Sequence, residues 1–123
     1  MKVPQIIQEL EAKYPDKTIV KNDANDPTEI ICEVEPTRDH PEYSLAIAVI
    51  DRSVSHYHKI STEAYTVIKG KLTLMINDEK RILHDGEQVT IPPGATHSAQ
   101  GDEVWVQVES RPGWTFEDHI IAE

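Results

Sequence analysis

The chain is poor in cysteine and glycine, with one cysteine and five glycines among its 123 residues. Because Cys32 stands alone, no intrachain disulfide can form. Cys32 lies in the apolar-rich run Glu29–Val34, where we expect a small buried hydrophobic side chain. A nucleophilic role would need a base beside it, and the sequence does not place one. A chain of this length can bury a core without disulfides.

Basic side chains are also few. Lys and Arg number 12 against 22 Asp and Glu, which gives a formal net charge of −10. This balance argues against a nucleic-acid surface, which needs clustered Lys and Arg, and against docking on anionic lipid. An acidic protein that is kept apart from its neighbours by charge accounts for the composition.

Long apolar runs are missing. No run approaches the roughly 20 residues of a membrane span, and Met1–Pro4 does not lead into the apolar core of about 7–15 residues that a secretory signal needs. We therefore expect a cytoplasmic protein that acts without a membrane. The length fits a single domain over residues 1–123.

Short apolar stretches separated by turn signals are plentiful. Residues 4–14 predict a short amphipathic helix that Pro15 ends, with Ile6, Ile7 and Leu10 at helical spacing. Eight later stretches predict strands: Ile30–Val34, Leu45–Ile50, Ala64–Ile68, Leu72–Ile76, Lys80–Leu83, Gln88–Ile91, Val104–Val108 and Thr115–Ile121. Because no long helix lies between them, they are typical of an all-β antiparallel sandwich or barrel.

Histidines at ligand spacing occur in two separated segments. His56 and His58 are two residues apart, so on an extended chain both imidazoles point to one face and can chelate one ion. Glu63 can return to that ion if the chain bends, and His97 can close the site from a distant turn. Three histidines and one glutamate suit a divalent transition metal ion (Zn, Fe, Mn, Ni, Co or Cu) better than Ca or Mg. A His-x-His pair alone is weak evidence, because a strand histidine is usually a surface or hydrogen-bonded residue.

The spacing of these residues and their glycines follows two motifs. The first segment has His56-x-His58-x4-Glu63-x6-Gly70, and the second has Gly86-x5-Pro92-x-Gly94-x2-His97. Both resemble the motifs of the cupins, a family of small double-stranded β-helix (jelly-roll) barrels. Two framing positions depart from the family pattern, which has glycine in place of Ile50 and asparagine in place of Gly101.

The resemblance implies a single antiparallel jelly-roll cupin domain, with the N-terminal helix at about 4–14 and a barrel core at about 43–112. It also implies that His56, His58, Glu63 and His97 hold the metal and leave one or two coordination positions open at the barrel mouth.

The remaining candidates have weaker support. If Glu63 points inward, Tyr65 shares its face and could touch a substrate, although a core tyrosine with a satisfied hydroxyl is an equal alternative. We expect solvent exposure for His84 and His40, and packing roles for Trp105, Trp114 and Phe116. His119, in the last predicted strand, could face solvent or a partner subunit. Gln107 could reach the pocket.

Three functions are compatible with these features. The first is a metalloenzyme, a dioxygenase or isomerase/lyase type, that acts on a small oxygen-rich molecule with Glu63 and Tyr65 as candidate catalytic residues. The second is a non-catalytic module that binds a sugar or small acid, and the third is a structural metal site. Exposed strand edges predict a homodimer, to which the N-terminal region or Phe116–Ile121 would contribute.

Overall fold

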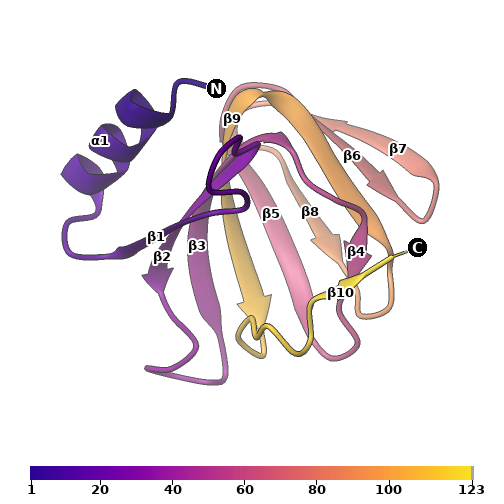
Figure 1. Cartoon of the computed structure of the whole chain (residues 1–123). Helices are drawn as coiled ribbons and strands as arrows, with labels where there is room; N and C mark the ends of the chain where they lie inside the picture. Colours follow the sequence, from indigo (N-terminus) through magenta and orange to yellow (C-terminus); the bar gives the residue numbers. More distant parts are fainter. Residues whose placement is uncertain (123) are drawn as a thin grey trace.

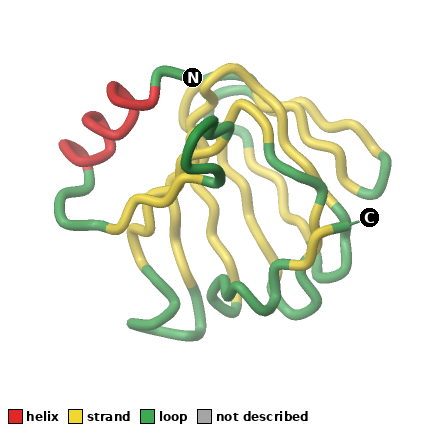
Figure 2. Tube along the Cα trace, viewed as in Figure 1, coloured by secondary structure: helices red, strands yellow, loops and turns green. Residues whose placement is uncertain are grey.

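The computed structural model describes residues 1–122, which form one curled antiparallel sheet with a single helix on its outside (Figures 1 and 2). The helix is α1, Val3–Lys13. The strands are β1 (Thr18–Lys21), β2 (Glu29–Glu35), β3 (Ser44–Arg52), β4 (His56–Tyr57), β5 (Thr62–Lys69), β6 (Leu72–Ile76), β7 (Glu79–Leu83), β8 (Gln88–Ile91), β9 (His97–Arg111) and β10 (Ile120–Ile121). The all-β antiparallel class with a short N-terminal helix is confirmed.

The long strand β9 holds the barrel together. The sheet runs in the order β1-β2-β3-β9-β4-β10, so β9 pairs with β3 and β4. Strands β5 and β6 pair with β9 as well. Its first residues pair with β6, as in Ile76 opposite His97, and its later residues pair with β3 on one side and β5 on the other. One strand that changes partners along its length lets a single sheet curl around an interior.

Helix α1 covers the outer face of β2 and β3. Pro4 occupies its first turn, where the missing N–H costs nothing. Ile6 and Leu10 are its buried residues, and they pack with Cys32 and Trp105. Cys32 is fully buried in this cluster, as expected for a small hydrophobic side chain. Among the described residues, no helix is long and apolar enough to cross a membrane.

A second apolar cluster fills part of the barrel interior. Its members come from β3, β5, β6, β8 and β9, with Leu72, Leu74 and Val106 fully buried. Tight turns join the strands around it. Asn77 and Asp78, both at positive φ, form the tip of the β6–β7 hairpin, as predicted. Gly70 has a φ of 112°, which explains why a glycine is needed at that turn.

Three predictions about strands were incomplete or wrong. Neither β1 nor β4 was predicted, because their four and two residues are too few to form a recognisable apolar stretch. The predicted strand Val104–Val108 is the middle of the much longer β9. The predicted strand Thr115–Ile121 is wrong: residues 114–119 form a loop, in which the Asp118 backbone N–H donates to the carbonyl and hydroxyl of Thr115, and strand pairing begins only at Ile120.

Candidate metal centre

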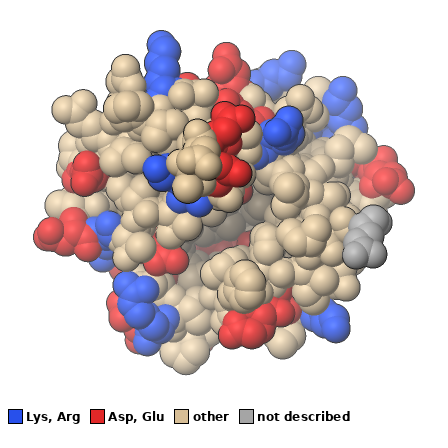
Figure 3. Space-filling model, in the orientation of Figure 1, with Lys and Arg blue, Asp and Glu red and all other residues tan. Residues whose placement is uncertain are grey.

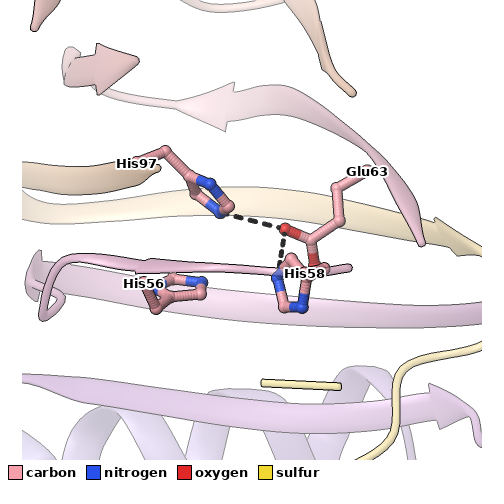
Figure 4. Close-up of side chains that lie close together, drawn as sticks. All are labelled: His56, His58, Glu63 and His97. Atoms are coloured by element: carbon pink, nitrogen blue, oxygen red, sulfur yellow. Dashed lines mark hydrogen bonds and ion pairs between the residues drawn. The ribbon is translucent and has the colours of Figure 1, made fainter. Parts of the chain in front are cut away.

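Four side chains from three parts of the chain meet inside the barrel (Figure 4). His56 begins β4 and lies opposite His97, the first residue of β9. His58 follows two residues later, and Glu63 is the second residue of β5. All four are buried, with exposures between 1% for His97 and 6% for His56. The alternation that predicted a common face for His56 and His58 therefore holds.

The ligand-type atoms of these residues are close to one another. One atom from each of the four lies within 4.8 Å of the others. Oε1 of Glu63 is 3.1 Å from Nε2 of His58 and 3.2 Å from Nε2 of His97. The cluster therefore has the donor set and the proximity that a transition metal ion requires.

The outward nitrogen of each imidazole is tied to the backbone. Nδ1 of His56 is 2.8 Å from the carbonyl oxygen of Val54, and Nδ1 of His97 is 2.9 Å from that of Ala95. Nδ1 of His58 is 2.9 Å from the carbonyl oxygen of Asp118. Because a carbonyl only accepts, each Nδ1 must carry the proton, which leaves the inward Nε2 with a lone pair when the ring is neutral. Metal-bound histidines in proteins are oriented in the same way.

This tautomer leaves the cluster with a surplus of acceptors. With neutral rings, the Nε2 lone pairs of His58 and His97 face the carboxylate oxygen of Glu63, and no proton lies between them. Within residues 1–122, Nε2 of His58 is a buried atom without a well-formed hydrogen bond, despite its short distance to Glu63. Buried acceptors at such distances need a cation between them, either an added proton or a metal ion. The four residues therefore fit a bound metal ion.

The pKa values in the cluster agree with a cation site. Burial, followed by the charge of neighbouring His97, lowers the pKa of His56 to about 4, so this ring is neutral at pH 7. Burial alone would raise the pKa of Glu63, but His58 and His97 outweigh it and hold that pKa at about 2. Burial would lower the pKa of His58, but Glu63 outweighs burial and raises it, so the carboxylate attracts a cation, either a proton on this ring or a metal ion in its place. A neutral imidazole and an ionised carboxylate are the forms that bind metals.

Asp118 supports the cluster from the C-terminal segment. Its carboxylate accepts hydrogen bonds from the backbone N–H groups of Lys59, Ile60 and Ser61 at 2.8–3.1 Å, and its backbone carbonyl accepts from His58. Burial opposes ionisation, yet these N–H donors lower the pKa of Asp118. One residue thus fixes both the ring of His58 and the loop that leads to Glu63.

His119 is not where the sequence suggested. We expected it in a strand, facing solvent or a partner. It lies instead in the loop before β10, half-buried, with its ring stacked on that of His56 at 4.3 Å between centroids. Its Nδ1 is buried without a hydrogen-bond partner among the described residues. No spacing rule could reveal this, because the chain returns to the site from about 60 residues beyond His58.

A cavity of about 330 Å³ opens beside the cluster. It is hollowed into the face shown in Figure 3, where acidic side chains are visible around and inside it. Tyr65 lines it with His56 and Glu63, so the predicted common face of Glu63 and Tyr65 holds. Burial, followed by the charge of Glu63, raises the pKa of Tyr65, so the phenol keeps its proton.

Of the other candidate residues, some lie as the sequence predicted and some do not. His84 is exposed as expected, and Trp105 packs in the core. His40 is only partly exposed, because its ring bonds Glu35 and stacks on Tyr43.

Two packing predictions were wrong, because the loop of residues 114–119 lies over the barrel mouth rather than in the core. Phe116 is 77% exposed, and Trp114 lies beside the cavity. Gln107 does not line the cavity, since β9 turns its neighbours Val106 and Val108 inward.

Known proteins share the sequence pattern in part. A family model described as "Cupin domain" matches residues 46–104. An uncharacterized protein from Aquifex aeolicus (strain VF5) is 38% identical over 66 residues, covering 53% of this chain and 54% of that protein. The match thus spans about half the length of this curated relative.

Solved structures share the fold. A Streptomyces Pac13 variant with uridine has a TM-score of 0.77 at 13% identity, covering 89% of this chain and 88% of that one. KdgF from Halomonas sp. has a TM-score of 0.64 at 20% identity, covering 76% and 87%. A variant of Bacillus subtilis oxalate decarboxylase has a TM-score of 0.73 at 18% identity, covering 88% and 31%. Together with the family match and the curled antiparallel sheet, these similarities show that this chain carries a small cupin-type domain.

Proposed function

We propose that this protein is a metal-dependent enzyme that acts on a small, oxygen-rich organic molecule. The observation that carries the proposal is the buried cluster of three imidazoles and one carboxylate, whose outward nitrogens are all fixed by carbonyl groups and whose open side meets a cavity of about 330 Å³. Cavities of about 300–1,000 Å³ are usual for small-molecule sites. The reaction in this proposal is of the dioxygenase or the isomerase/lyase type.

The chain's own residues divide the work in this proposal. His56, His58, Glu63 and His97 would hold the ion, which supplies Lewis acidity and, if redox-active, electron transfer. Tyr65 keeps its proton and donates a hydrogen bond to a substrate oxygen in the cavity. Glu63 primarily holds the cation, because a carboxyl with a pKa of about 2 is a weak base, and any catalytic role for it depends on release from His58 and His97.

Related structures are compatible with this proposal but differ in what they bind. Pac13 is a nucleoside dehydratase, and variants of it have been solved with uridine. Oxalate decarboxylase of Bacillus subtilis has Mn(II) centres. Small oxygen-rich compounds are therefore reasonable first probes, and Mn is one of the metals to test.

The test begins with the metal content of protein purified without added metal, with His97→Ala as the control. We expect about one equivalent in the wild type and little in the variant. Metal-free protein is then reloaded with Mn, Fe, Co, Ni, Cu or Zn and assayed on nucleosides, sugars, keto acids and enediols. Turnover above that of the free metal supports the enzyme. A loaded protein that binds these compounds without converting them is instead the non-catalytic binding module, and a wild type that binds no metal overturns the proposal.

We also propose a homodimer. Large apolar side chains are exposed near β4 and β10, with Phe116 at 77%, Ile60 at 66% and Ile121 at 54%. Exposed apolar side chains beside a strand edge are typical of an association surface. Light scattering during size-exclusion chromatography is expected to give twice the chain mass, and Phe116→Ser is expected to weaken the dimer. A monomer at all concentrations contradicts this proposal.

A further inference from the structure

The acidic side chains that line the cavity are not equivalent. Strand β2 points alternate residues inward, so Glu29, Glu33 and Glu35 share the cavity wall. Glu33 lies 3.6 Å from the guanidinium of Arg38, and Glu35 lies 2.9 Å from the imidazole of His40. Two of these three carboxylates therefore have a partner at the cavity mouth.

Glu29 differs from both. Among residues 1–122, its carboxylate makes no hydrogen bond and no ion pair, although it is only partly exposed. The carboxylate of Glu63 and the phenol of Tyr65 line the same cavity as Glu29. The charge of Glu63 raises the pKa of Glu29, and the charge of Glu29 raises the pKa of Tyr65. The hydroxyl of Tyr65 also has no hydrogen-bond partner in the described part of the chain. Two polar groups of the cavity are thus left for whatever occupies it.

We propose that Glu29 is a second acid–base group of this cavity, which donates a proton to an oxygen of the bound molecule and selects neutral, hydroxyl-bearing molecules over carboxylates. This inference rests on the proposed function, because it needs the cavity to bind a small molecule. In the step, the O–H bond of the Glu29 carboxyl breaks and an O–H bond forms at the substrate oxygen. Glu29 is left as a carboxylate, which regains its proton from water.

The charges around the cavity agree with both proton donation by Glu29 and selection of neutral molecules. Burial, and then the charge of Glu63, raises the pKa of Glu29 to about 7, so both protonation states are populated near neutral pH. A group that titrates near the working pH is suited to general acid–base catalysis. The other titratable or charged groups that line the cavity are Glu33, Glu35, Arg38, His56, Glu63, Tyr65 and His119.

In the metal-free protein, where no bound cation offsets the charge of Glu63, the same lining disfavours anions. Glutamates outnumber cationic side chains four to one, and Arg38 is engaged by Glu33. A carboxylate placed beside an ionised Glu29 would meet a like charge with little water to screen it. A neutral polyol meets no such repulsion, and its hydroxyl groups can both donate to Glu29 and accept from Tyr65.

The test compares wild type with Glu29→Gln, which keeps the shape and removes the titration. Glu11→Gln, on the exposed face of α1, removes the same charge far from the cavity. NMR titrations of metal-free and zinc-loaded protein use matched probes: D-galactose and D-galacturonate, D-ribose and D-ribonate, and myo-inositol. We expect wild type to bind the neutral probes more tightly. In Glu29→Gln the preference for neutral over anionic probes should fall by about tenfold or more, and in Glu11→Gln by less than about twofold.

A second measurement needs no variant. The carboxyl carbon of Glu29, assigned by its loss in Glu29→Gln, should titrate near neutral pH, and a bound neutral probe should shift its midpoint. Equal binding of neutral and anionic probes, no binding of any probe, or a midpoint that no probe moves overturns the inference. Because zinc affinity is measured on the same samples, a failure of the metal site shows separately from a failure of Glu29.

Discussion

The two faces of strand β2 differ in what they contact. Its outward residues, Ile30 and Cys32, are fully buried against helix α1 and the apolar cluster beneath it. Its inward residues, Glu29, Ile31 and Glu33, line a cavity that reaches the metal-type cluster at His56 and Glu63. Successive residues of one strand thus serve stability on one side and chemistry on the other. The difference suggests that the two faces can be changed almost independently.

The largest expected effect is on the outward face. Leu10→Ala should lower the free energy of unfolding by about 4 kcal/mol. The Leu10 side chain is wholly buried between α1 and the sheet, and its removal leaves a cavity there. Urea unfolding measures this. Metal affinity of the folded variant should not change, and a loss of affinity would show that the two faces are coupled.

The next effect is on the inward face. His97→Ala should weaken metal binding more than about 100-fold, since it removes one of four ligands rather than a supporting group. Competition with a chromophoric chelator measures the affinity. Removal of the ion from wild type should lower the melting temperature, because the ion binds the folded state alone. The same treatment should leave the variant unchanged, and an equal drop in both would contradict the site.

A smaller effect is expected where the C-terminal loop supports the centre. Asp118→Asn keeps the shape but loses the charge that accepts three backbone N–H groups. We expect a loss of about 2 kcal/mol in unfolding free energy and about tenfold in metal affinity. Asp102→Asn, at an exposed position of β9, is the matched control. If Asp118→Asn lowered stability alone, the loop would not position His58.

The smallest effect depends on pH. The folded-state pKa of Glu29, about 7, lies above its ordinary value, so between about pH 4.5 and 7 the folded state binds more protons than the unfolded state. Stability contributed by this group therefore falls as pH rises through that window. Glu29→Gln should be more stable than wild type by about 1–2 kcal/mol at pH 8 and nearly equal at pH 4, as measured by urea unfolding. A difference that does not change with pH would contradict the raised pKa.

Much of the fold could be predicted because its signals are local. Alternating apolar residues and turn glycines located most strands, and Pro4, Leu10 and Pro15 located the helix. The predictions were wrong where contacts between distant parts of the chain decide the local structure. The stretch from Thr115 to Ile121 is apolar enough for a strand, but the hydrogen bonds of Asp118 to distant N–H groups favour a loop.

The candidate centre shows the same division. Residue spacing by itself determined which four side chains could hold a metal, because parity along a strand and a family-type motif are properties of the sequence. Only the tertiary structure decided what surrounds them: that His119 stacks on His56, that Asp118 orients His58, and that Glu29 faces the same cavity without a partner among the described residues. These residues are far from the motifs in sequence, and curling of the sheet alone brings them to the site.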